Sequence, residues 1–346
     1  MEKLKISIKR IIISIKIPFL YIFSRSYLLS AIYYTLLSKS FWREFNSVLI
    51  GRYLYLKRIN DKKENIFLLR RNVHRLEKGL LMIPRKSVFG VKYIEELVDT
   101  YRYIIKENEY EPYHDELNWA YDVLTKYFLI IGEHPIILKS KNKFESINVK
   151  FYSKVKKIPY NKINNKPNIS ADAFTQLIEN RRSVRWYLEK PVPRELIDQA
   201  ILNAAQSPSS CNRLPYEFRV IDDVNLVKSI SEIPMGTKGF ASNIPVMIAI
   251  IGHLDAFFDE RDRHLIYVDS SLASMAMILS FETMGLSTCC LNWPDIPKKE
   301  KKIHSFLDLN NNNRVIMLLA VGWADPNGKV AYSEKKSLNI IRKYNK

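Results

Sequence analysis

The chain has 346 residues, 47% of them hydrophobic, which allows two domains with buried cores and excludes a wholly disordered chain. The net charge of +18 is uneven, because residues 1–170 carry 32 basic against 16 acidic side chains whereas residues 171–346 carry 22 against 20. An anionic membrane or a nucleic acid would attract the first half, and the charge of the second half indicates no particular partner.

Residues 1–60 combine basic side chains with aliphatic and aromatic ones, and we expect Pro18 to divide them into two short helical pieces. Lys16 and Arg25 interrupt the apolar stretch 11–38 and leave charge-free runs of 8 and 13 residues, whereas a spanning helix needs about 20. Three interpretations stay open, in falling order of preference. The segment lies in an anionic membrane interface, packs on the protein itself, or spans the bilayer once.

The three cysteines show no disulfide or metal pattern. Cys211, Cys289 and Cys290 form no CxxC pair, and we expect the last two to be buried where a strand begins. No histidine pair has ligand spacing either, so no metal is expected. A reducing, cytoplasmic location fits best, peripheral to the inner face of the membrane if residues 1–60 bind it.

Residues 61–158 read as a helical accessory region. Apolar side chains recur every three or four residues from Ile66 to Leu80, and Gly79 is expected to end that helix. Further helices are expected near 91–106 and 115–131. The polar cluster on the first helix is either an anion site or, more often for such clusters, a solvated and salt-bridged face; its members are His74, Arg75, Glu77 and Lys78.

The polar, proline-flanked residues 159–170 are the best candidate for a linker, so a separate domain is expected over 171–346. Beyond the linker the pattern predicts helices alternating with strands, which is typical of an α+β fold. The expected helices cover 173–180, 193–205 and 269–284, and the expected strands cover 217–221, 245–251 and 314–321.

Two clusters in this second half offer groups that bind a polar ligand. The segment RRSVR at 181–185 presents three guanidinium groups, which suit a phosphate, although an isolated cluster of this kind is more often a solvated turn. The segment PSSCN at 208–212 offers short polar side chains and free backbone donors, which can hold the edge of a polar ring. Their shared presence favours a binding site.

As an ordered set, the motifs of residues 171–346 resemble the FMN-dependent nitroreductase family. The set is specific, although no single piece is. The matching segments are RRSVRWY (181–187), PVPRELIDQAILNAAQSPSSCNRLPYEF (191–218), DSSLASMAMILSFETMGLSTCC (269–290) and VGW (321–323).

The resemblance implies a central, largely antiparallel sheet flanked by helices, and an intertwined homodimer with FMN at its interface. It implies that the FMN phosphate and ribityl chain contact Arg181, Arg182, Ser183 and Arg185. It also implies that four residues lie against the flavin ring, and that the partner subunit contributes some of them. These residues are Pro208, Ser209, Ser210 and Asn212. A backbone N–H around Asn292 would face flavin N5, and Lys335 or Lys336 would close the phosphate end.

The chain departs from the family pattern at three places. Leu214 stands where the family often has Gln, and the preceding Arg213 is expected to bring a positive charge for an anionic substrate. The strand end reads GWAD rather than GYP, which weakens the alignment of Lys335 and Lys336. The segment between 251 and 269 is short, so the lid that sets substrate choice in relatives is expected to be small or supplied elsewhere, with the N-terminal half as the candidate.

The leading hypothesis is therefore an FMN oxidoreductase that passes hydride from NAD(P)H to a nitroaromatic, a quinone or a related small oxidised metabolite. The alternative is a membrane-surface accessory protein that uses the same domain as a flavin-binding scaffold, for example in envelope or surface-glycan assembly. Nucleic-acid binding is disfavoured, because the aromatic residues of the basic half occupy apolar helix positions and no known motif appears.

Overall fold

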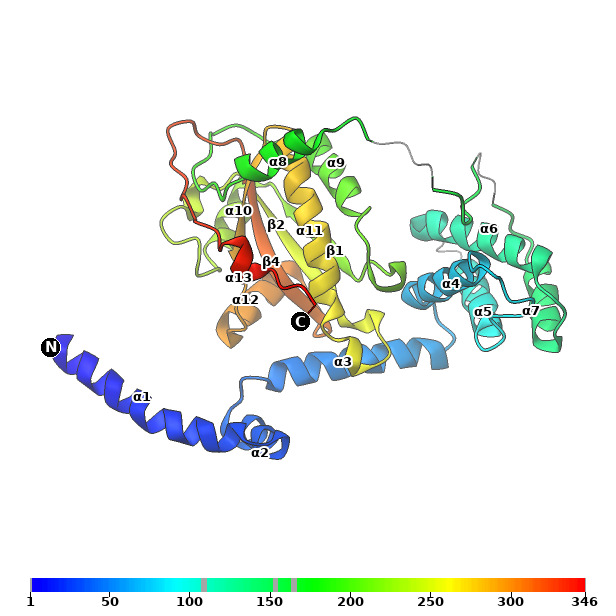
Figure 1. The fold of residues 1–346 in the computed structure, drawn as a ribbon, viewed down its shortest axis with the longest axis horizontal. Helices are drawn as coiled ribbons and strands as arrows, with labels where there is room; N and C mark the ends of the chain where they lie inside the picture. The colour runs from blue at the N-terminus through cyan, green and yellow to red at the C-terminus, as the bar shows by residue number, and fades with distance from the viewer. Residues whose placement is uncertain (1, 107–110, 152–154, 163–166, 346) are drawn as a thin grey trace.

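The structure is a computed structural model, and it describes residues 2–106, 111–151, 155–162 and 167–345. Figure 1 shows three parts. An N-terminal arm, residues 2–37, reaches away from the rest of the chain. A helical region, residues 66–145, and a sheet region, residues 171–345, lie side by side, and helix α3 runs along the sheet region.

The arm is more continuous than the sequence predicts. It comprises α1 (Glu2–Ser24), α2 (Tyr27–Ile32) and the π-helical turn η1 (Tyr33–Leu37). The predicted break at Pro18 is wrong, because α1 continues through it. Proline keeps a helical φ angle and loses one hydrogen bond, which bends a helix more readily than it ends one. The chain turns instead at Ser26, whose Oγ accepts a hydrogen bond from the backbone N–H of Leu29 (3.1 Å) and caps α2.

Helix α3 (Trp42–Asn60) attaches the N-terminal residues to the sheet region. At Gly51 the two backbones approach so closely that a Cβ atom would lie 2.7 Å from Leu254. Ion pairs secure the helix on either side of this contact: Arg43 with Asp295 and Glu300, Arg52 with Glu260, and Arg58 with Asp255.

All three helices predicted for the helical region are present, and the region contains a fourth helix, α7 (Pro135–Glu145), that was not predicted. The region contains α4 (Ile66–Leu80), α5 (Ile94–Lys106), the short η2 (Glu111–Tyr113), α6 (His114–Ile130) and α7. Gly79 does not end α4, which continues to Leu80. A Cβ atom at Gly79 would lie 2.1 Å from the Phe89 ring, so the glycine permits close packing. The sequence pattern missed α7 because lysine and asparagine fill its exposed face.

Three side chains of the polar cluster on α4 contact other protein groups. His74 Nδ1 lies 3.6 Å from Glu77 Oε2, and Glu77 also accepts a hydrogen bond from the Trp119 indole (3.0 Å). Arg75 stacks on the ring of Tyr93 at 3.7 Å. These contacts favour the salt-bridged interpretation over an anion site.

The sheet region has the predicted α+β architecture. Its four antiparallel strands follow the order β1-β2-β4-β3; they are β1 (Tyr216–Ile221), β2 (Val246–His253), β3 (Ser287–Asn292) and β4 (Asn313–Gly322). Its main helices are α8 (Ala171–Asn180), α9 (Arg194–Ala204), α10 (Val224–Ser231), α11 (Leu265–Thr283), α12 (Pro297–Leu307) and α13 (Leu338–Ile341). The predicted strands and helices are all present, whereas α10, α12 and α13 were not foreseen.

Strand β2 shows how the layers form. Its side chains alternate between two cores: Val246, Ile248 and Ile250 pack with α9 and α11, whereas Met247, Ala249 and Ile251 pack with α10 and α12. Helices therefore cover both faces of the sheet. At β3 the same alternation buries Cys289 and leaves Cys290 exposed, so the prediction that both are buried holds for one of them.

Among the described residues, the stretch Glu260–Thr283 alone is long and apolar enough for a membrane span, and half of it is buried within the protein. It contains α11, the helix that packs against the centre of the sheet.

Candidate functional site

The segment 181–185 lies at the end of the sheet where β3 begins. Ser183 forms an isolated bridge with Thr288, and the Val184 N–H donates to the Thr288 carbonyl at 3.0 Å. Val184 and Tyr187 are buried and anchor the segment. Arg181 and Arg182 are half-buried between these anchors and α8, and Arg185 is exposed.

The three guanidinium groups have no acidic partner within hydrogen-bonding distance in the described part of the chain. Arg185 makes one long contact, 3.4 Å to the Ser183 carbonyl. Arg181 lies close enough to Glu282 to affect it: burial raises the pKa of that carboxyl, and the Arg181 charge opposes the rise. Guanidinium groups that are not hydrogen-bonded to an acidic side chain suit an anionic group such as a phosphate.

The loop 208–215 is held in an unusual backbone conformation. Cys211, Asn212 and Leu214 have φ angles of 53°, 51° and 48°, in the left-handed region. The Asp269 carboxylate accepts a hydrogen bond from the Ser210 N–H (2.9 Å), and Ser209 Oγ accepts one from the Leu214 N–H (3.1 Å).

These bonds correct one expectation about the loop. The backbone N–H groups of residues 210, 212, 213 and 214 are all engaged within the chain, so they are not free donors. The amide of Asn212 and the hydroxyl of Ser210 are two polar side-chain groups of the loop. Both residues are half-buried, and Pro208 is exposed.

Arg213 lies inside the protein. Its side chain is 3% exposed, stacks on the Phe257 ring at 4.9 Å and lies 3.5 Å from Ser210 Oγ. Burial lowers the pKa of this guanidinium. The charge of Arg213 also acts on Tyr55 of α3. Burial raises the pKa of the Tyr55 hydroxyl, and the charges of Arg71 and Arg213 lower it. The predicted substrate residue is therefore buried, and its charge acts on Tyr55 in the N-terminal half of the same chain.

The contact between Arg70 and Asn212 is the feature of the site that sequence patterns missed. Arg70 Nε donates to the main-chain oxygen of Asn212 at 2.6 Å, and Nη1 pairs with Glu116 at 3.1 Å. The guanidinium also lies over the Trp119 ring. The two residues are 142 positions apart, so no local pattern could have identified the contact.

Within one chain the two clusters lie at opposite ends of the sheet. Thr288, beside the segment 181–185, pairs with Val321 of β4. Tyr216, which follows the loop, pairs with Gly252, and Gly252 pairs with Arg314 of β4. Positions 314 and 321 are seven residues apart, which corresponds to roughly 23 Å along an antiparallel strand.

The remaining predicted contacts lie on the surface. Asn292 is exposed at the end of β3, an edge strand of the sheet. Lys335 and Lys336 are exposed in the tail that follows β4. In the described part of the chain, no hydrogen bond or ion pair joins either lysine to residues 181–185.

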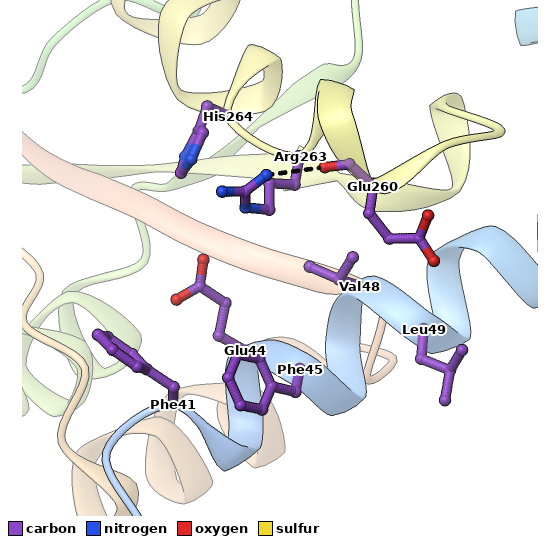
Figure 2. Close-up of a pocket in the computed structure, with 8 residues that line it drawn as sticks. All are labelled: Phe41, Glu44, Phe45, Val48, Leu49, Glu260, Arg263 and His264. Carbon is purple, nitrogen blue, oxygen red and sulfur yellow. Dashed lines mark hydrogen bonds between the residues drawn. The ribbon is translucent and has the colours of Figure 1, made fainter. Parts of the chain in front are cut away.

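Two large cavities border the N-terminal half. One of about 630 Å³ lies between α3 and the segment before α11 (Figure 2), and none of the predicted flavin residues lines it. Its apolar wall is Phe41, Phe45, Val48 and Leu49, and its polar rim is Glu44, Glu260, Arg263 and His264. The other, of about 600 Å³, adjoins the loop at Asn212 and is also lined by Arg70, Trp119 and Tyr160.

The comparisons with known proteins concern the second half of the chain. Residues 178–238 and 232–323 match the model of the nitroreductase family. The iodotyrosine deiodinases of Danio rerio and Rattus norvegicus are each 24% identical to this chain, over 199 and 196 residues. Those matches cover 49% of this chain and 66% and 68% of the two deiodinases.

Another relative is named as an NADH dehydrogenase/NAD(P)H nitroreductase of Methanothermobacter thermautotrophicus. It is 31% identical over 112 residues, which are 32% of this chain and 56% of that protein. Among solved structures, an FMN-dependent nitroreductase from Clostridium difficile R20291 aligns with 25% identity and a TM-score of 0.42, covering 49% of this chain and 98% of that one. A nitroreductase family protein from Streptococcus pneumoniae TIGR4 aligns with 18% identity and a TM-score of 0.43, covering 49% and 99%.

Proposed function

Residues 178–323 belong to the nitroreductase family, and from that premise we propose that the chain is an FMN-dependent oxidoreductase that works as a homodimer. The observation that carries the proposal is the group of three guanidiniums at 181–185, which have no acidic partner in the described structure. Planar guanidinium groups bind phosphate oxygens in pairs, so this cluster suits the phosphate of FMN.

The residues present fit FMN. Arg181, Arg182 and Arg185 would hold its phosphate, with Ser183 beside them. The Asn212 amide and Ser210 hydroxyl would hydrogen-bond the edge of the ring, since the backbone N–H groups of residues 210, 212, 213 and 214 already donate within the chain. When bound, FMN supplies the two-electron redox chemistry. The part of this chain would then be to bind and orient the flavin.

Two observations support a homodimer. First, the arginine cluster and the loop 208–215 lie at opposite ends of one sheet. Second, α11 carries a stripe of exposed apolar side chains, Val268, Leu272 and Met275, which are 50%, 46% and 40% exposed. If this stripe packs against a second copy, each site combines the arginines of one copy with the loop of the other. Lys335 or Lys336 would then close the phosphate end.

We propose NAD(P)H as the reductant and a small oxidised aromatic compound, either a nitroaromatic or a quinone, as the acceptor. The relative named as an NAD(P)H nitroreductase supports this choice. The deiodinase relatives favour a second class of acceptor, a halogenated phenol such as an iodotyrosine. The cavity beside Asn212 is bordered by Trp119 and Tyr160, which suits an aromatic ring in either case.

The test begins with the absorption spectrum of the purified full-length chain and identification of any flavin released by acid. The holoprotein is then mixed with NADH or NADPH without oxygen, and a nitroaromatic, a quinone or an iodotyrosine is added. We expect bleaching of the flavin by one nicotinamide and reoxidation by one acceptor class. A chain that neither carries FMN nor binds added FMN would refute the proposal. Retained flavin that no acceptor reoxidises would favour the scaffold alternative.

A further inference from the structure

All the charged side chains of residues 3–43 are basic. From Lys3 to Arg43 the sequence contains no acidic residue, while basic side chains occur at positions 3, 5, 9, 10, 16, 25, 39 and 43. Between these charges the segment consists mostly of isoleucine, leucine, phenylalanine and tyrosine. A surface with this composition attracts a partner that is both anionic and apolar.

The arm exposes most of its apolar side chains. Along α1, isoleucines at 8, 11, 12, 13, 15, 17 and 22 are 46–68% exposed. The arm folds mainly on itself: Phe23 packs on Tyr33 with ring centroids 5.5 Å apart, and Ser30 Oγ donates to the Phe23 carbonyl at 2.9 Å. On the outside of this hairpin, Tyr27 is 98% exposed and Leu28 is 71% exposed.

Helix α3 is apolar on its outer face as well. Its inner face contains Ser47, Gly51 and Tyr55, which are buried against the sheet region. The opposite face carries an unbroken stripe of exposed side chains at 3- or 4-residue spacing: Trp42, Phe45, Leu49, Tyr53 and Leu56. The cavity of Figure 2 shares Phe45 and Leu49 with this stripe. Helix α3 follows the arm and runs along the body of the protein (Figure 1). The exposed apolar residues of the arm are therefore followed along the chain by the stripe of α3.

Charge decides which partner can cover this surface. A second copy would bring the same six basic residues of the arm, at positions 3, 5, 9, 10, 16 and 25, so two arms would repel each other. A nucleic acid would satisfy the charges but leave the apolar side chains in water. An anionic bilayer satisfies both, because basic groups meet lipid headgroups, aliphatic side chains enter the acyl boundary, and Trp and Tyr prefer the interface.

We propose that the N-terminal arm and the outer face of α3 form one surface that binds an anionic lipid bilayer without crossing it. Arg10 and Lys16 lie within α1, so a spanning α1 would carry these charges into the hydrocarbon. A helix that lies in the interface lets both side chains reach the headgroups. This proposal does not depend on the flavin chemistry.

The experiment is flotation of the full-length protein with vesicles of equal parts phosphatidylglycerol and phosphatidylcholine, and with vesicles of phosphatidylcholine alone. We expect binding to the first kind, weak binding to the second, and release from the first by high salt. Absence of binding to both, equal binding to both, or binding that resists salt and alkaline washing as a spanning chain does would overturn the proposal. Binding to duplex DNA with none to vesicles would also overturn it.

Matched variants locate the surface. Leu56→Ser, at a position 47% exposed, should lower the partition coefficient about tenfold, because it removes apolar area from the interface. Leu226→Ser on α10, at a position 50% exposed, should leave it unchanged. Lys16→Gln and Arg25→Gln should each lower it about fivefold on anionic vesicles only. Circular dichroism checks that each variant folds. Equal losses for Leu56→Ser and Leu226→Ser would exclude α3 from the surface.

Discussion

Arg70 donates a 2.6 Å hydrogen bond from Nε to the main-chain oxygen of Asn212, and this bond joins helix α4 to the loop that follows α9. The loop holds three residues in the left-handed region, a conformation that surrounding contacts must maintain. Asp269 binds its first part, and Arg70 binds its tip. The helical region therefore supports the loop at which we place the flavin ring.

Replacement of Arg70 by alanine should loosen that loop. The variant loses a hydrogen bond from a charged group, worth about 1.5–3 kcal/mol, and leaves Glu116 without its cation. We expect the dissociation constant for FMN to rise about tenfold, as measured by quenching of flavin fluorescence. Arg75→Ala on the same helix is the control, because Arg75 stacks on Tyr93 instead. If both variants bind FMN equally, the bond does not position the loop.

A mixed dimer distinguishes a shared site from a site within one chain. Arg182→Ala should remove a phosphate contact and Asn212→Ala a ring contact, so each homodimer should bind FMN at least tenfold more weakly. When the two variants are co-expressed and the mixed dimer is isolated through two affinity tags, one site should have lost both groups and the other should be intact. We expect one FMN per dimer at the affinity of the unmodified protein.

Sites built within single chains give another result. Each site of the mixed dimer would then lack one group, and no site would regain full affinity. The stoichiometry and affinity, measured by titration calorimetry, separate the two arrangements. Arg194→Ala is a suitable control partner for co-expression, since Arg194 lies on the surface, where it pairs with Asp222.

Sequence patterns predicted the elements that periodicity governs. The apolar runs of β2 and β4 and the three- and four-residue spacing in α4 identified buried faces correctly, because burial on a regular element repeats along the chain. The errors fall at single residues that were predicted to end a helix. Pro18 is accommodated within α1, and Gly79 makes room for Phe89 instead of ending a helix.

For the site, too, the sequence predicted some features and missed others. The motifs identified which residues to examine, since arginine and short polar side chains indicate phosphate and ring binding by their chemistry. The motifs could not predict where these residues lie in the fold, because the register of the sheet sets the distance between residue 181 and residue 212. The burial of Arg213 and the Arg70–Asn212 bond depend on how the helical region packs on the sheet region, and no spacing within the sequence encodes that packing.

The exposed stripe of α11 predicts how the proposed dimer can be broken. Met275→Glu places a charge within an apolar interface, where desolvation without a partner is unfavourable by several kcal/mol. We expect the protein to elute as a monomer in size-exclusion chromatography with light scattering, and to lose FMN at the same time. Leu226→Glu, on α10, should change neither property. A monomeric Met275→Glu variant with full FMN content would show that one chain completes the site.

The carboxylate of Glu300 predicts how stability depends on pH. It is 2% exposed and lies between α3 and the sheet region, where it pairs with Arg43, accepts a hydrogen bond from the Trp293 indole (2.6 Å) and lies 3.2 Å from His304 Nε2. Burial alone would raise the pKa of Glu300, but the adjacent His304 and the hydrogen bonds from Arg43 and Trp293 bring it down to about 2. The folded pKa is thus lower than the value of 4.5 expected in the unfolded chain.

A carboxyl whose pKa is lowered by folding stabilises the protein above its unfolded pKa, and this contribution is lost as the pH falls from about 4.5 towards 2. The difference between the two pKa values corresponds to a contribution on the order of 3 kcal/mol. In Glu300→Gln the free energy of unfolding, measured by urea denaturation, should therefore fall less between neutral and acidic pH than in the unmodified protein. Glu195→Gln, at an exposed position in α9, should follow the unmodified curve. If the two variants show the same pH dependence, Glu300 does not hold α3 in place through its charge.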